Sequence, residues 1–129
     1  MSKEETLEFL VDFSEGKLVP TIVQNVEGEV LYLSSTNQEA FDKMRETKTV
    51  WRYSKTNDRL LQVGSASGKI EYVEEIYVNC FQNTLLLRVK QEKDFACHTG
   101  MHSCFYRRLK QDDSLEMTQK QIVNPEEIY

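Results

Sequence analysis

The sequence lacks a hydrophobic run long enough to cross a membrane. A spanning helix needs about 20 consecutive apolar residues, and no stretch of the 129-residue chain approaches that length. The opening residues 1–5, Met-Ser-Lys-Glu-Glu, are too charged to begin a secretory signal. We therefore expect a cytoplasmic protein that has no membrane partner.

An excess of basic residues is also missing. Sixteen lysines and arginines stand against 21 aspartates and glutamates, which gives a formal net charge of −5. A protein that binds nucleic acid must present a basic face to the phosphates, so this balance argues against a general nucleic-acid-binding protein. A small molecule or another protein is the expected partner.

Cysteine and histidine are scarce, with three and two residues respectively. An odd number of cysteines in a chain without an export signal makes disulfides a poor explanation, which leaves metal binding, reactivity or packing. Two of the cysteines and both histidines lie within eight positions, from Cys97 to Cys104. Thiolates and imidazoles bind zinc and activate nucleophiles, so we expect any chemistry to be located in this loop.

Neither an internal repeat nor a domain linker divides the sequence. Its 40% apolar and 29% charged residues are typical of a soluble globular protein, and 129 residues suffice for a single domain with its own core. We expect a helix over residues 1–17, the body of the domain over 18–109 and a polar tail over 110–129.

The hydrophobic pattern predicts an α+β fold, with an antiparallel or mixed sheet and two helices. Capping-box spacings that begin at Ser2 and Thr36 predict helices over residues 2–16 and 36–47. An edge strand over 105–109 and a helical turn after Pro125 are further expectations. Runs of β-branched and alternating apolar residues predict the other strands, at 19–26, 29–34, 49–54, 59–63, 69–80 and 84–91.

Period-two counting assigns one face of the long strand at 69–80 to five residues, which are Ile70, Tyr72, Ile76, Val78 and Cys80. The segment before it, Gly-Ser-Ala-Ser-Gly at 64–68, is the most flexible part of the interior. Its small residues would let the backbone approach a ligand, although they also describe an ordinary loop, which is the reading that sequence alone favours.

The spacing of the cysteines leaves their role open. Six residues separate Cys97 from Cys104 and sixteen separate Cys80 from Cys97, so no CxxC knuckle of a structural zinc site is present. Three thiolates would suit a catalytic zinc with one position open to water. Cys80, taken alone, is better explained by packing. His98 has the chemistry to relay protons, whereas His102 reads as a lone loop histidine.

The cysteine and histidine loop resembles the phosphoribosyl-AMP cyclohydrolase family, histidine-pathway enzymes that open a purine ring by hydrolysis. The resemblance is carried by Ala-Cys-His-Thr-Gly at 96–100 and Ser-Cys-Phe-Tyr-Arg at 103–107. Similar residues extend it over roughly 18–108, at Leu-Val-Pro 18–20, Ile-Val-Gln 22–24, Glu-Val-Leu 29–31, Asn37, Glu39-Ala40 and Ser67-Gly68.

The resemblance implies an intertwined α+β homodimer that acts on a small, nucleotide-like substrate. It further implies a zinc site between subunits, held by Cys80 of one chain and by Cys97 and Cys104 of the other. His98 would assist the zinc-bound water that attacks the ring. The residues matching the substrate side of the family motif are Ser54, Lys55, Ser67, Gly68 and Arg107.

Departures from the family pattern all fall on the substrate and magnesium side. The family's Asp-Cys-Asp-x-Asp reads Asn-Cys-Phe-Gln-Asn at 79–83, and magnesium prefers the charged oxygens that are absent, which argues against a magnesium site. The Ser-Arg-Ser-Arg run reads Ser-Lys-Thr-Asn at 54–57, and Lys-Gly-Glu-Thr-Ser-Gly reads Val-Gly-Ser-Ala-Ser-Gly at 63–68. Both changes weaken the grip on phosphate.

These observations predict a zinc-dependent hydrolase that opens the family's purine ring or a smaller, less anionic cyclic amidine. The alternative is a non-catalytic dimer of the same fold that zinc stabilises and that binds a ligand or a partner. A metal-free dimer is the third possibility.

Overall fold

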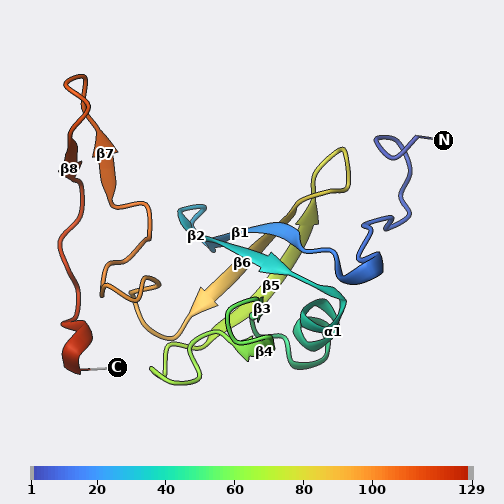
Figure 1. Cartoon of the computed structure of the whole chain (residues 1–129), viewed down its shortest axis with the longest axis horizontal. Coiled ribbons are helices and arrows are strands. Elements are labelled where there is room, and N and C mark those ends of the chain that lie inside the picture. The colour runs from blue at the N-terminus through green and yellow to red at the C-terminus, as the bar shows by residue number, and fades with distance from the viewer. Residues whose placement is uncertain (1, 128–129) are drawn as a thin grey trace.

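A four-stranded mixed sheet organises the chain (Figure 1). In the computed structural model, which describes residues 2–127, β1 (Val19–Asn25) lies between β2 (Val30–Thr36) and β6 (Leu85–Gln91), and β5 (Glu71–Val78) pairs with β6 at the other edge. The β1–β6 pair is parallel and the other two pairs are antiparallel. The expected α+β class with a mixed sheet is therefore confirmed.

One face of this sheet forms the core. Alternate residues of the two central strands are fully buried, among them Val23 of β1 and Leu87 of β6, which are paired in register. The α-helix α1 (Gln38–Thr47) adds Phe41 and Met44 to the same core. Burial of such side chains stabilises the fold by roughly 1.5–3 kcal/mol for each fully buried residue.

The N-cap of α1 lies one residue later than the predicted cap, Thr36. The Asn37 side chain accepts a hydrogen bond from the Ala40 backbone N–H at 2.8 Å, which is the N-cap interaction. Thr36 instead ends β2, where its buried hydroxyl is bonded to the hydroxyl of Thr21 at 2.6 Å. Asparagine and threonine are both good caps, so the sequence did not separate them.

Two small antiparallel sheets complete the fold. The first joins β3 (Trp51–Ser54) to β4 (Arg59–Gln62), as the sequence predicted. The second joins β7 (Arg107–Leu109) to β8 (Leu115–Met117), and Figure 1 shows it standing away from the main sheet. The strand β8 was not predicted, whereas the expected turn after Pro125 is present as the 3-10 helix η2 (Pro125–Glu127). Within residues 2–127, no helix is long and apolar enough to cross a membrane.

The predicted N-terminal helix is wrong, and residues 2–127 contain one α-helix rather than two. Over residues 2–17 the structure contains turns and a single 3-10 helix, η1 (Ser14–Gly16). The Phe9 ring stacks on Phe41 of α1 with centroids 5.1 Å apart, while the Leu10 N–H bonds to the Gln82 side chain. A short isolated helix is marginal in water, so these tertiary contacts prevail over the capping-box pattern.

The predicted face of the long strand is also wrong, because β5 contains a bulge. The register moves from Val73 opposite Val89 to Glu75 opposite Arg88, so Glu74 is an extra residue. A bulge of this kind reverses the alternation of faces. Glu71 and Val73 therefore turn inward before the bulge and Ile76 after it, while Tyr72 is exposed.

Candidate functional site

Two thiols are held together by a tight loop that follows β6. The Gly100 N–H donates a hydrogen bond to the Cys97 carbonyl at 2.9 Å. The backbone N–H of Cys97 donates one to the Met101 carbonyl at 3.2 Å, and the two bonds close the turn. At the other end of the loop, the Cys104 N–H bonds to the Leu31 carbonyl of β2 at 2.7 Å. Each cysteine shifts the pKa of the other, so the six-residue spacing brings the two thiols near each other.

The two thiols differ in acidity. Burial on its own raises the pKa of Cys97, but hydrogen bonds from the Thr99 hydroxyl, at 3.0 Å, from its backbone N–H and from the Cys104 thiol bring this pKa below its usual value. Burial and the neighbouring Cys97 raise the pKa of Cys104. Cys97 is therefore the more acidic of the two thiols, and a pair of cysteine sulfurs suits a soft metal ion.

Cys80 lies at the opposite end of the sheet. It follows β5 in an exposed turn, beyond the point where Val78 pairs with Leu85, whereas the loop of Cys97 leaves from the far end of β6 (Figure 1). The strand β6 has seven residues, so at ~3.3 Å per residue the two ends are about 20 Å apart. Within residues 2–127 of one chain, no three cysteine, histidine or acidic side chains converge on a metal position.

A cleft of about 700 Å³ opens beside the thiols. The edge strand β2, the β3–β4 hairpin, the 63–67 loop and the cysteine loop form its walls. Of the sequence-predicted residues, His98, Cys104 and Ser67 line it. His98 is exposed at the rim, with its Nδ1 4.0 Å from the Cys97 sulfur.

The other predicted substrate residues lie elsewhere. Ser54 is buried and its hydroxyl accepts a hydrogen bond from the Asn57 N–H in the β3–β4 turn, where Lys55 is exposed. Gly68 has a left-handed φ of 74° and closes the 64–68 loop through its N–H, without lining the cleft. Arg107 lies on β7 with its guanidinium over the Tyr106 ring.

The sequence analysis missed three cations that line the cleft, which are Arg52, Arg59 and Lys69. Within the described part of the chain, no aspartate or glutamate lines it. Period-two counting groups Arg52 with Ser54 and Arg59 with Leu61, but only the register of the hairpin, with Ser54 opposite Arg59, puts both arginines on one face.

Buried polar residues lie behind this wall. Glu71 is only 1% exposed, and one of its carboxylate oxygens accepts a hydrogen bond from the Tyr32 hydroxyl. Burial raises the pKa of Glu71, which the Tyr32 hydroxyl and the charge of Lys69 partly oppose. Burial also lowers the pKa of Lys69, whose ammonium donates to the Ala96 carbonyl at 2.6 Å. Lys69 is thereby bonded to the cysteine loop, while its charge acts on Glu71.

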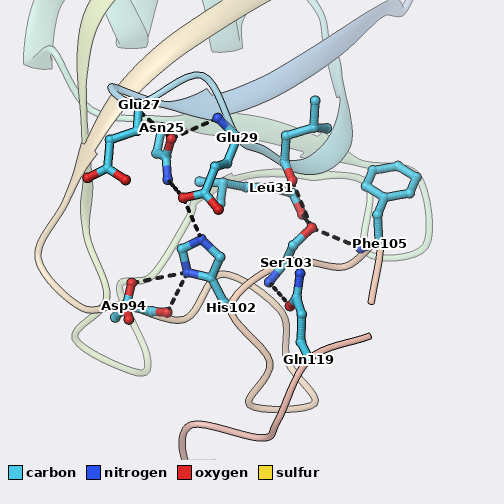
Figure 2. A network of polar contacts seen from close by, with 10 residues as sticks. Asn25, Glu27, Glu29, Leu31, Asp94, His102, Ser103, Phe105 and Gln119 are labelled. Carbon is cyan, nitrogen blue, oxygen red and sulfur yellow. Dashed lines mark hydrogen bonds and ion pairs between the residues drawn. The ribbon is translucent and has the colours of Figure 1, made fainter. Parts of the chain in front are cut away.

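His102 fastens the cysteine loop to the β1–β2 turn, as Figure 2 shows. One ring nitrogen lies 3.1 Å from an Asp94 carboxylate oxygen and the other lies 3.3 Å from a Glu29 oxygen. Asn25 donates to the same Glu29 oxygen at 2.8 Å. Partial burial alone would lower the pKa of His102, but Asp94 and Glu29 raise it above its usual value. His102 is therefore a loop anchor rather than an isolated surface residue.

The C-terminal segment crosses the same loop. Ile122 and Val123 donate backbone hydrogen bonds to the Gly100 carbonyl at 2.9 and 3.3 Å, and the Gln119 side chain accepts one from Ser103. A Cβ atom at Gly100 would stand 2.0 Å from the Val123 carbonyl oxygen. The glycine at this position is thus required both by its φ of 83° and by this close approach.

The turn that carries Cys80 uses its amides internally. The Asn79 side chain accepts hydrogen bonds from the backbone N–H groups of Asn83 and Thr84 at 2.9 and 3.0 Å. Gln82 is buried and holds the N-terminal segment through three hydrogen bonds, with Leu10, Glu8 and Lys3. These residues do not fit a magnesium ion, since no carboxylate is present in the turn and its amides are already engaged.

The sheet, the paired thiols and the cationic cleft are those of a small α+β protein with a candidate hydrolytic site. The family model of phosphoribosyl-AMP cyclohydrolase matches residues 32–106, more than half of the chain. Relatives of this chain include proteins of that name from several bacteria. The protein of Chlorobium chlorochromatii (strain CaD3) is 40% identical over 131 residues, covering 99% of this chain and 95% of the relative.

The protein of Chlorobium limicola (strain DSM 245 / NBRC 103803 / 6330) is 41% identical over 120 residues, which cover 92% of this chain and 87% of the relative. That of Clostridium botulinum (strain 657 / Type Ba4) is 44% identical over 101 residues, which cover 77% of this chain and 91% of the relative. This chain belongs to the phosphoribosyl-AMP cyclohydrolase family, hydrolases of histidine biosynthesis. The resemblance inferred from the cysteine and histidine loop is confirmed.

Proposed function

We propose that the protein is a zinc-dependent cyclohydrolase that opens the purine ring of phosphoribosyl-AMP or a related cyclic amidine. The observation that carries this proposal is the convergence of Cys97 and Cys104 beside a cleft that His98 also lines. Membership of the family and the identity shared with relatives of that name support it.

The thiol pair fits a zinc ion by its chemistry. The pKa of Cys97 lies below its usual value, which eases loss of its proton, and thiolates are strong ligands for zinc. Zinc, when bound, supplies a Lewis acid and lowers the pKa of its water toward neutral pH. In this proposal His98, which lines the cleft, accepts a proton from the attacking water and returns it to the ring nitrogen that leaves.

A homodimer would supply the third ligand. Cys80 and the thiol pair lie beyond opposite ends of β6, a strand of about 20 Å, so Cys80 of a second copy is the expected partner for Cys97 and Cys104. The outer face of the sheet supports such a dimer, because a row of apolar residues crosses all four strands in register, formed by Leu33, Ile22, Leu86 and Tyr77. Leu33 and Tyr77 are exposed in the single chain, which suits burial against a second copy.

Of the two substrates, the family's phosphoribosyl-AMP is favoured over a less anionic ring. The cleft is large enough for a nucleotide, and its lining carries three cations. The loss of the acidic residues around Cys80 removes a magnesium site without removing this positive wall.

The test is the metal content of protein purified without added metal, measured beside a spectroscopic assay of ring opening in phosphoribosyl-AMP. About one zinc per chain with turnover, unchanged by magnesium, is the expected result. Zinc without turnover on any cyclic amidine would instead identify a zinc-stabilised binding protein, whose dimer should dissociate on chelation. Absence of zinc would overturn the proposal.

A further inference from the structure

We propose that Arg52 and Arg59 form a phosphomonoester-binding subsite on the β3–β4 wall of the cleft. Neither arginine belongs to the motif through which the sequence resembles its family. The subsite deepens the proposed function, on which it rests for the reaction but not for the binding, because it gives an anionic substrate a point of attachment.

The register of the hairpin places the two arginines on one face. Arg52 pairs with Leu61 and Ser54 pairs with Arg59, so the two arginines are diagonal neighbours across the strands. Diagonal neighbours lie roughly 7–8 Å apart, within reach of long side chains. Both side chains line the cleft, and two guanidinium forks at this separation can bind one phosphate between them.

Neither guanidinium has a protein partner in residues 2–127. Arg88 and Arg108 make ion pairs with Glu75 and Glu116, as is usual in a chain with more acids than bases. Arg52 and Arg59, by contrast, make no hydrogen bond or ion pair there, and like charges on neighbouring strands repel. An anion in the cleft would relieve this repulsion.

A buried hydroxyl independently points to a ligand. Ser67 is 9% exposed and lines the same cleft, yet its Oγ has no hydrogen-bond partner among the described residues. The Ser34 hydroxyl in the β2 wall is buried without a partner as well. Hydroxyls left unsatisfied in this way are costly, so an acceptor oxygen that came within reach of either one would be stabilised.

The position of the subsite agrees with the chemistry proposed for the cleft. Arg52 and Arg59 belong to the β3–β4 wall, while Cys104 and His98 come from the cysteine loop. Lys69 lies at the base, where the Ala96 carbonyl holds its ammonium. A nucleotide bound with its phosphate at the arginines would extend toward the thiols within the same 700 Å³.

The experiment measures binding by calorimetry, using the full chain with adenosine monophosphate, inorganic phosphate and acetate. We expect R52Q and R59Q each to weaken binding of both phosphate compounds about 10-fold, and the double variant about 100-fold, as charge-assisted hydrogen bonds are lost. R52K and R59K keep the positive charge but lose the two-pronged guanidinium, so they should weaken phosphate binding by less than the glutamine variants do. Acetate should not bind measurably.

The matched control is Arg45→Gln, an exposed arginine of α1 outside the cleft, which should bind like the wild type. Wild-type affinity in R52Q and R59Q, or no phosphate binding by the wild type, would overturn the subsite. With phosphoribosyl-AMP, R52Q and R59Q should raise KM about 10-fold at nearly constant kcat. Wild-type turnover with unchanged KM in both variants would refute the subsite alone, while absent turnover with arginine-dependent binding would refute the proposed function alone.

Discussion

The two ends of the β5–β6 hairpin carry polar residues of opposite character. At the end near the cysteine loop, the exposed His98 ring lines the cleft with only a long contact to the Cys97 sulfur, and the Ser67 hydroxyl has no partner within residues 2–127. In the turn at 79–83, the side-chain amides of Asn79 and Gln82 are hydrogen-bonded to backbone groups. Polar groups without protein partners mark the end where a ligand is expected, and satisfied ones mark the end that has become structural.

The largest expected effect is loss of zinc and of activity on substitution of a cysteine. Cys80 tests the comparison most directly, because it lies in the turn at 79–83 and is the one residue there that we assign to the metal. Cys97→Ser and Cys80→Ser should both lose bound zinc and reduce kcat/KM by more than about 100-fold, since loss of second-shell partners alone costs 10–100-fold. Metal analysis and steady-state kinetics check both. A Cys80→Ser protein with full zinc would confine the metal to the cysteine loop.

The next effect concerns the C-terminal segment 119–123 that crosses the cysteine loop, which we call the strap. Gly100→Ala should destabilise the protein by about 2–3 kcal/mol, because the left-handed φ costs ~1–2 kcal/mol and the new Cβ would displace the Val123 carbonyl. Urea unfolding measures the loss, and hydrogen exchange should show faster exchange at Ile122 and Val123. Gly28→Ala is the control, since Gly28 has a φ of 87° with nothing within 4 Å. Equal losses in the two variants would mean that the strap contributes nothing.

A smaller effect is expected at the structural end. Gln82→Ala removes three hydrogen bonds and should cost about 2 kcal/mol at the ~0.5–1.5 kcal/mol typical of each. Turnover should be unchanged, and exchange of the Leu10 amide should become faster. Gln38→Ala, which loses one exposed bond to Asp42, should cost little. A fall in kcat in Gln82→Ala would show that the two ends are coupled.

The smallest effect is the pH dependence contributed by His102. Its folded-state pKa is raised, so its ion pairs contribute stability below the unfolded value of about 6.5, and this contribution is lost as pH rises through the higher folded-state pKa. Because Glu29 and Asp94 are largely exposed, we expect less than about 1 kcal/mol. His102→Gln should therefore lower stability at pH 5.5 more than at pH 8.5. Parallel stability curves for variant and wild type would contradict this.

Most strands and the helix α1 were predicted because their apolar residues repeat at the period of the structure they form. Leu85, Leu87 and Val89 alternate along β6 and are all fully buried. Where a single extra residue changes the period, as at Glu74, the same counting fails. The helix prediction for the N-terminal segment was wrong for another reason, since the conformation of this segment depends on contacts with Phe41 and Gln82, which lie far away in the sequence.

The candidate site was predicted in part. The spacing of Cys97 and Cys104 with His98 between them indicated the reactive loop, since clustering of these residue types needs no knowledge of the fold. The family motif indicated Ser54 and Lys55, which lie at the β3–β4 turn, whereas Arg52 and Arg59 reach the cleft through the register of the hairpin, which the sequence does not show. The partner of His102 in the β1–β2 turn, Glu29, lies 73 positions away and no local pattern could indicate it.

The parallel pairing of β1 with β6 sets an order of events during synthesis. Each of these strands has a local antiparallel partner, so the β1–β2 and β5–β6 hairpins can form while the chain is still leaving the ribosome. Thr21, however, meets Leu85 only after the whole stretch between them has been made. Joining two preformed hairpins through such distant contacts is slow compared with forming either one. Until that step is complete, the core edges of β1 and β6 remain open to other chains, which makes it the stage at which aggregation competes with folding.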